Sequence, residues 1–164
     1  MNLSERYERD VAALFESAGP SVDGVRVVHR DVVAAADGSY EIDTTMRFQF
    51  AELEFVVLVE AKLQGRPVDR STAQVLHQKV QSTGAHKGVL VSSSGYQRGA
   101  LVFAAAHGIA LFDYAGGRRE VRLRGPVDPT GAERLWHEVT PAGTLRPLDL
   151  SGDWLARLVA PAGA

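Results

Sequence analysis

The sequence predicts an α/β fold in which a mixed β-sheet is flanked by helices. Two patterns lead to this prediction. In residues 1–62 a helical period is followed by strand-like stretches separated by tight turns, which is typical of antiparallel pairing. From residue 55 to residue 114 apolar strand-like stretches alternate with helical ones, and such strand–helix–strand connections join parallel strands. The length of 164 residues suits one domain.

The first third of the chain predicts one helix and three strands. Ser4 is placed to act as the N-cap of the helix. Gly19-Pro20 ends this helix, and a turn at Asp37-Gly38 separates the first two strands. The predicted elements are a helix over 4–18 and strands near 25–30, 40–50 and 55–62. The last of these strands is rich in Val and Leu, as expected for a strand that is buried on both faces.

Helices and strands alternate after residue 62, and Gly84 and Gly108 each mark the end of a helix. The predicted elements are a helix over 69–83, a strand over 88–91, a helix over 97–107 and a strand over 109–114. Beyond Gly116-Gly117 the pattern weakens to a short strand near 120–124 and short helices at 131–137 and 152–159. We therefore expect a core of residues 1–115 and a C-terminal extension, residues 116–164, packed on that core.

Composition and charge narrow the functional class. The chain has no cysteine, which excludes disulfides and thiolate zinc sites. Apolar stretches are too short to span a bilayer and the amino terminus is charged, so a cytoplasmic protein without a membrane partner is expected. Residues 1–59 carry eleven acidic and five basic side chains, whereas residues 60–98 carry six basic and two acidic ones. This basic middle segment predicts either an anion-binding surface or a solvated helix face.

Two carboxylates and a lysine are expected to meet at the end of one strand. Glu60 and Lys62 are two residues apart, so they share a face of the third strand. If the second and third strands form a hairpin that turns near Ala51-Glu52, Asp43 lies opposite Glu60. Two close carboxylates favour Mg²⁺, and a lysine beside them is suited to phosphodiester hydrolysis. The alternative is a structural ion pair at a sheet edge.

A longer pattern surrounds these residues and resembles a known family. The stretch from Val59 to Leu111 contains VEAKLQGRPV, a polar helix and then GAHKGVLVSSSGYQRGALVFAAAHGIAL. With the preceding Asp43, it resembles the Mrr-like (type IV) restriction endonuclease domain of the PD-(D/E)xK nuclease superfamily. The resemblance covers residues 1–114. It implies a restriction-endonuclease-like core with the order αβββαβαβ.

The resemblance implies roles for individual residues. Asp43, Glu60 and the carbonyl of Ala61 would bind Mg²⁺, for which Mn²⁺ would substitute, and Lys62 would be the catalytic lysine. The further active-site candidates are Glu8, His77 and Gln78. For these three the alternative is a position on a solvated helix face.

The basic segment also offers candidates for contact with DNA phosphates. The loop Ser92–Tyr96 lies between a strand and a helix, where backbone N–H groups can hold an anion. The candidates for phosphate contact are Ser93, Lys79, Lys87 and Arg98. The same loop could instead simply cap the helix.

The leading hypothesis is a Mg²⁺-dependent DNA endonuclease of the Mrr-like restriction type. Double-strand cutting needs two active sites, so a homodimer is expected, and a partner protein could confer specificity on the weak, phosphate-driven binding of the basic patch. One alternative is a structure-selective repair or junction nuclease. Another is a non-catalytic DNA-binding subunit on a nuclease-derived fold.

Overall fold

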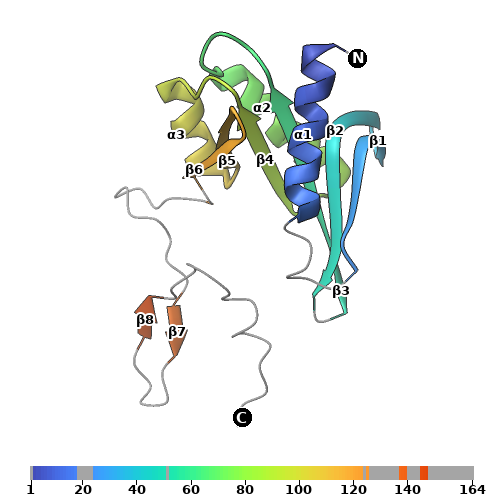
Figure 1. Ribbon diagram of the computed structural model, residues 1–164. Helices are drawn as coiled ribbons and strands as arrows, with labels where there is room; N and C mark the ends of the chain where they lie inside the picture. The colour runs from blue at the N-terminus through green and yellow to red at the C-terminus, as the bar shows by residue number, and fades with distance from the viewer. Residues whose placement is uncertain are drawn as a thin grey trace.

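The central feature of the structure is a mixed sheet of six strands (Figure 1). The computed structural model describes residues 2–17, 24–50, 52–123 and 125, together with the backbone of 137–139 and 145–147. The strands of the sheet, in spatial order, are β1 (Arg26–Ala35), β2 (Gly38–Phe50), β3 (Leu53–Lys62), β4 (Lys87–Ser92), β5 (Ala110–Ala115) and β6 (Arg118–Leu123). The helices are α1 (Leu3–Ser17), α2 (Arg70–Thr83) and α3 (Arg98–His107).

The pairing of the strands confirms the predicted mixed sheet. β1, β2 and β3 pair in antiparallel fashion, β3, β4 and β5 pair in parallel, and β6 returns antiparallel to β5. The two parallel pairs are the ones connected through α2 and α3, as expected for crossover connections. The order of elements up to β5 is the predicted αβββαβαβ order of a restriction-endonuclease-like fold.

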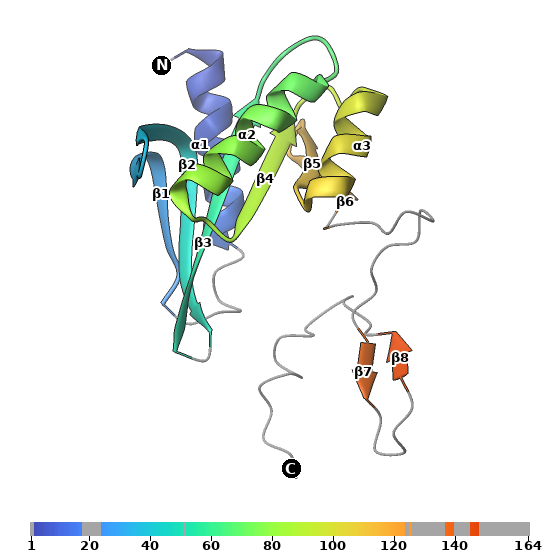
Figure 2. The same ribbon diagram turned by 180° about the vertical axis from the view of Figure 1, so that it is seen from behind.

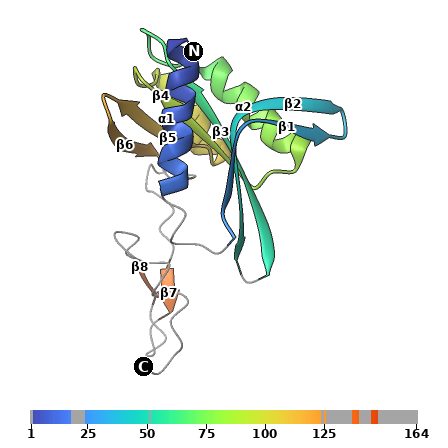
Figure 3. The same cartoon turned by 45° about the vertical axis from the view of Figure 1, so that its right-hand side comes forward.

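Helices cover both faces of the sheet. α1 lies along one face, whereas α2 and α3 lie on the other, as Figures 2 and 3 show from two further directions. On the α1 side, Val11 and Phe15 pack with Val57 and Val59 of β3. The second core, on the α2 and α3 side, includes Leu58, Leu76, Val80, Leu90, Phe103 and Leu111. β3 is thus buried on both faces, which explains its run of Val and Leu.

The beginning of α1 corrects one prediction. The expected N-cap, Ser4, lies inside the helix, because α1 begins at Leu3. Asn2 takes the capping position, and its Oδ1 accepts a hydrogen bond from Glu5 N at 2.8 Å. The hydroxyl of Ser4 donates instead to Glu8 Oε1 at 3.4 Å. Ser and Asn are both good N-caps, and the spacing of apolar residues locates the start of a helix only to within a residue or two. The sequence pattern therefore did not distinguish Asn2 from Ser4 as the cap.

The C-terminal part is described only in short pieces. β6 pairs with β5, so the sheet continues to Leu123. A separate antiparallel pair is formed by β7 (His137–Val139) and β8 (Leu145–Pro147). His137 therefore belongs to a strand and not to the expected helix at 131–137, whose other residues, like those of the helix at 152–159, lie outside the described part. The packing of the extension on the core stays a prediction. Within the described residues no helix has both the length and the apolar character needed to cross a membrane.

Candidate active site

The β2–β3 hairpin has the register that brings Asp43 and Glu60 to the same level. β2 ends at Phe50 and β3 begins at Leu53. Glu52, in the short connection, has a φ of 66°, which suits a tight turn. Thr44 pairs with Val59, and this is the last recorded pair at this end of the ladder. The next positions along the two strands are Asp43 and Glu60, so the turn predicted near Ala51-Glu52 is confirmed.

Asp43 lies at an interruption in the pairing of β1 with β2. The recorded pairs are His29 with Thr44 and Asp31 with Ile42, so that Arg30 and Asp43 are skipped. Arg30 has a φ of 53°, a left-handed conformation that is uncommon for a residue other than glycine. Asp43 instead directs Oδ2 to β3, where it accepts a hydrogen bond from Ala61 N at 2.8 Å. The Asp43 carboxylate is therefore tied to the E-x-K segment by a backbone N–H group.

Glu60 is the most buried acid of the site and contacts two lysines. Its exposed fraction is 5%. Glu60 Oε2 accepts a hydrogen bond from Lys62 Nζ at 3.1 Å, and Oε1 accepts one from Lys79 Nζ at 2.5 Å. Lys79 comes from α2 and also donates to the carbonyl of Glu41 at 3.0 Å. The predicted Glu60–Lys62 proximity is present, and Lys79, predicted as a phosphate contact, reaches the same carboxylate.

Burial and charge shift the proton affinities of this cluster. The pKa of Asp43 is raised by burial and by the negative charge of Glu60, which outweigh the Ala61 N–H group and Lys62. Burial lowers the pKa of Lys62, but the charges of Glu60 and Asp43 more than offset burial, so the pKa is raised. Lys62 is therefore held as an ammonium ion beside the carboxylates of Glu60 and Asp43.

The oxygen atoms at this position fit a hard divalent cation. Asp43 and Glu60 supply carboxylates and Ala61 a backbone carbonyl, and Mg²⁺ and Mn²⁺ prefer such donors. The raised pKa of Asp43 indicates a carboxylate that a cation would stabilise. In the part of the chain that the structure describes, no three His, Asp or Glu side chains gather into a metal cluster. Two carboxylates nevertheless suit Mg²⁺, which often keeps several waters and takes further oxygens from a substrate phosphate.

A cavity of about 270 Å³ opens beside this cluster, between the end of β3 and α2. Its lining residues are Glu60, Lys62, Ser71, Thr72, Val75, Leu76 and Lys79. The α2 residues of this lining form two neighbouring rows with a spacing of four, 71, 75 and 79 and 72 and 76, so a single face of the helix borders the site. A substrate group that enters this cavity would meet both lysines.

Glu8 lies close to the cluster. Its Oε2 accepts a hydrogen bond from Arg30 Nε at 3.2 Å and lies 3.5 Å from His29 Nε2. Its charge contributes to raising the pKa of both Asp43 and Lys62, although it is the smallest contribution in each case. Glu8 therefore lies near enough to Asp43 and Lys62 for its charge to act on both. An active-site role of Glu8 stays a prediction.

His77 and Gln78 lie on other faces of α2. The ring of His77 packs against Phe103 and His107, with centroid distances of 5.8 Å and 4.5 Å, toward α3. Gln78 is exposed. Among the contacts of the described residues, neither side chain bonds to Glu60. Their predicted active-site roles stay predictions.

The candidates for phosphate contact are distributed in different places. Ser93 Oγ accepts a hydrogen bond from Gln64 N at 3.1 Å and lies 3.3 Å from the carbonyl of Lys62, so it connects the loop after β4 to the end of β3. Lys87 Nζ donates to the carbonyl of Gly108 at 2.5 Å, at the end of α3. Arg98 is exposed at the start of α3. Ser93 and Lys87 are thus engaged within the protein, and a contact of these residues with DNA stays a prediction.

One of two similar solved structures shares the fold of this chain. The protein of unknown function AF1548 is 19% identical, with a TM-score of 0.55, over 68% of this chain and 58% of that chain. AspBHI, a DNA modification-dependent restriction endonuclease, is 21% identical, with a TM-score of 0.43, over 68% of this chain and 30% of that chain. The chain thus spans somewhat over half of the first protein and under a third of the second. No curated protein matches the sequence.

A family comparison covers most of the described sheet. The Mrr_cat family, described as restriction endonuclease, matches residues 3–116, from the start of α1 to the turn after β5. This match contains Asp43, Glu60 and Lys62 as well as both crossover helices. The chain therefore belongs to the Mrr_cat restriction endonuclease family.

Proposed function

We propose that this protein is a Mg²⁺-dependent DNA endonuclease of the Mrr-like restriction type, which hydrolyses phosphodiester bonds at the Asp43, Glu60 and Lys62 cluster. The observation that carries the proposal is the hairpin geometry. Asp43 Oδ2 is bonded to Ala61 N, and Glu60 Oε2 is bonded to Lys62 Nζ, at the end of a buried strand. Membership of a restriction endonuclease family supports a nuclease function for this arrangement.

The residues of the site divide the chemistry between them. Asp43, Glu60 and the carbonyl of Ala61 would hold Mg²⁺ or Mn²⁺, which when bound polarises a phosphoryl oxygen and lowers the pKa of a water molecule. The Ala61 N–H group fixes the Asp43 carboxylate. Lys62, kept charged by its acidic neighbours, stabilises the negative charge that develops on the phosphate. The expected products carry 5′-phosphate and 3′-hydroxyl ends.

Double-strand cutting and sequence specificity each require more than the single active site described above. Cutting both strands of a duplex requires two active sites, which a homodimer would supply. The basic residues near the site are few, so binding of one copy to DNA is expected to be phosphate-driven and sensitive to salt. A partner protein or the second copy would then contribute sequence specificity.

Cleavage of supercoiled plasmid tests the proposal. The wild type is compared with Asp43→Asn and Lys62→Met on methylated and unmethylated DNA, with Mg²⁺ or Mn²⁺. The matched control is Asp37→Asn, at the exposed turn between β1 and β2. We expect metal-dependent nicking or cutting by the wild type and the control, and its loss in the two site variants.

Three results would contradict the proposal. Wild-type protein that binds DNA but cuts none of these substrates would favour a non-catalytic subunit. Cutting that survives both site substitutions would place the active site elsewhere. Cleavage restricted to branched DNA, in a parallel assay, would replace the restriction function with a structure-selective one.

A further inference from the structure

Both oxygens of the Glu60 carboxylate are engaged by lysines. Lys62 Nζ lies 3.1 Å from Oε2, and Lys79 Nζ lies 2.5 Å from Oε1. The side chain of Glu60 is 7% exposed and that of Lys79 is 18% exposed, so water and salt screen this second pair only weakly. Hydrogen bonds between charged groups of this kind are stronger than neutral ones. A cation that binds Glu60 must therefore compete with an ammonium group.

The two lysines differ in how they are held. Lys62 lies on the same strand as Glu60, two residues away. Lys79 reaches the site from α2 and has a second acceptor, the carbonyl of Glu41, at 3.0 Å. Because this carbonyl remains available, Lys79 can leave Glu60 without losing every hydrogen-bond partner. Lys79 therefore keeps a hydrogen-bond acceptor when a cation takes its place on Glu60.

The charges of the cluster lead to the same conclusion. The carboxylates of Asp43 and Glu60 are balanced by the ammonium groups of Lys62 and Lys79. A divalent cation added to this set creates an excess of positive charge, and Lys79 is the ammonium group that directly occupies Glu60 Oε1. Repulsion between a divalent ion and an ammonium group a few ångströms away weakens binding of the ion substantially.

We propose that Lys79 is a positioning residue that holds Glu60 until a divalent cation binds, and that its charge sets the metal concentration that the site requires. This inference rests on the proposed function, because it takes Asp43 and Glu60 as metal ligands. Lys79 then acts as an internal competitor of the metal, and the catalytic lysine remains Lys62.

Binding of Mn²⁺ to the full chain, without DNA, tests the inference. Free Mn²⁺ is followed by electron paramagnetic resonance for the wild type and for three variants, the neutral Lys79→Gln and Lys79→Met and the charged Lys79→Arg. The glutamine variant retains a hydrogen-bond donor, which guards against a loss of folding. We expect the neutral variants to bind Mn²⁺ about tenfold more tightly than the wild type, and the arginine variant to bind as the wild type does.

Lys87→Met is the matched control. Lys87 is also partly buried, and its Nζ donates to a backbone carbonyl, that of Gly108, at 2.5 Å. It has no carboxylate within salt-bridge distance among the described residues. We expect Lys87→Met to change Tm and leave Mn²⁺ affinity unchanged. A purely structural role of Lys79 would produce this same pattern in its neutral variants.

The possible results separate this inference from the proposed function. Equal or weaker Mn²⁺ binding by the neutral Lys79 variants would overturn the inference, and so would equal tightening in the arginine variant. In either case plasmid cleavage by the wild type would leave the nuclease proposal standing. If neither the wild type nor Lys79→Gln binds Mn²⁺ at all, the metal-dependent function fails and this inference fails with it.

Discussion

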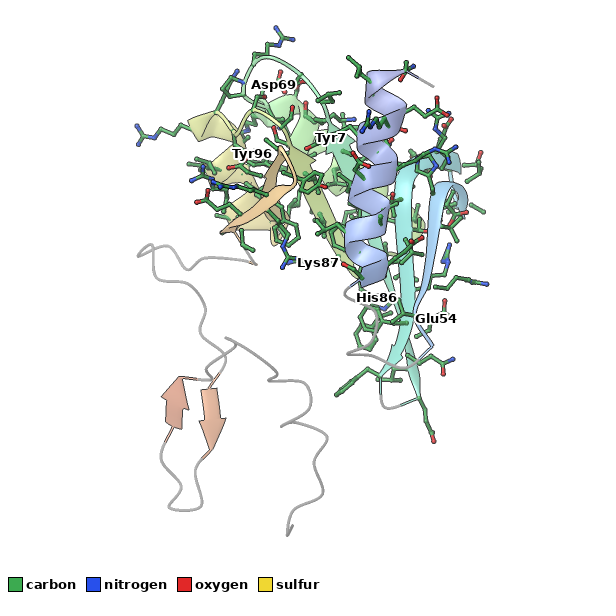
Figure 4. The ribbon with its side chains drawn as sticks, viewed as in Figure 1. Tyr7, Glu54, Asp69, His86, Lys87 and Tyr96 are labelled. Carbon is green, nitrogen blue, oxygen red and sulfur yellow. The ribbon has the colours of Figure 1, made fainter. Side chains whose placement is uncertain are left out.

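The β2–β3 hairpin is built differently at its two ends. Near the turn, the rings of Phe48 and Phe55 stack at a centroid distance of 5.3 Å, and the ring of His86 lies 5.2 Å from Phe55. Glu54 and His86 mark this end in Figure 4. At the other end, Asp43 and Glu60 are held by N–H and ammonium groups.

The two ends of the hairpin therefore differ in how far they tolerate substitution. Hydrophobic contacts are non-directional, and rings near an exposed turn already face water in part, so a substitution there changes little buried area. In contrast, a buried polar cluster depends on every partner, since removal of one partner leaves another group buried without compensation. We therefore expect substitutions of the same chemical kind to have unequal effects at the two ends.

The largest expected contrast concerns two glutamates of β3. Glu60→Gln should lower the rate of plasmid cleavage by about 10²–10³-fold, because the site loses a negative charge. Glu54→Gln, at the exposed end of the same strand, should cleave as the wild type does. Rates measured under single-turnover conditions with Mg²⁺ provide the check. Similar rates for the two variants would remove the distinction between the ends.

The second contrast concerns two leucines of β3. Leu58 is fully buried, whereas Leu53 is 61% exposed next to the turn. Leu58→Ala should lower the free energy of unfolding by about 3 kcal/mol, because it leaves a cavity between the sheet and the helices. Leu53→Ala should change it by less than about 0.5 kcal/mol. Urea denaturation measures both values, and a loss for Leu53→Ala as large as that for Leu58→Ala would contradict the prediction.

The smallest expected effect is a gain in the stability of the fold when Asp43, at the charged end of the hairpin, is replaced by a residue that cannot ionise. The pKa of Asp43 is raised in the folded protein, so folding favours the protonated carboxyl, and the ionised form destabilises the fold. Its stabilising contribution is present below the unfolded pKa and is lost as the pH rises through the folded pKa. Asp43→Asn should therefore raise Tm at pH 7 by on the order of a few degrees in EDTA.

The pH dependence distinguishes this effect from a change in packing. The gain in Tm of Asp43→Asn should diminish as the pH falls toward 3.8, the ordinary pKa of an aspartate. Thermal unfolding of the wild type and of the variant across this pH range gives the answer. A variant that is less stable than the wild type at pH 7 would mean that the Asp43 carboxylate stabilises the fold.

Much of the fold was predictable because the relevant signals are local. The alternation of apolar strand-like stretches with helical ones, and the glycine after each helix, predicted α2 and α3, and Gly84 and Gly108 indeed cap them in left-handed conformations. The chemistry of the turn and the two-residue period of a strand predicted that Asp43 and Glu60 would come together. By contrast, Arg30 gave no signal of its positive φ, because arginine rarely adopts it.

Local patterns are sufficient to specify the mixed sheet, the β2–β3 register and the position of the E-x-K segment at the end of a buried strand. These features depend on periods and turns within a few residues of one another. The face of α2 that meets the site depends instead on packing between distant segments. Leu76 and Val80 enter the core and so orient the helix, which directs Lys79 to Glu60 and turns His77 toward Phe103. The three consecutive polar residues between Leu76 and Val80 have no local preference between these directions, because the packing of a helix on a sheet fixes its rotation.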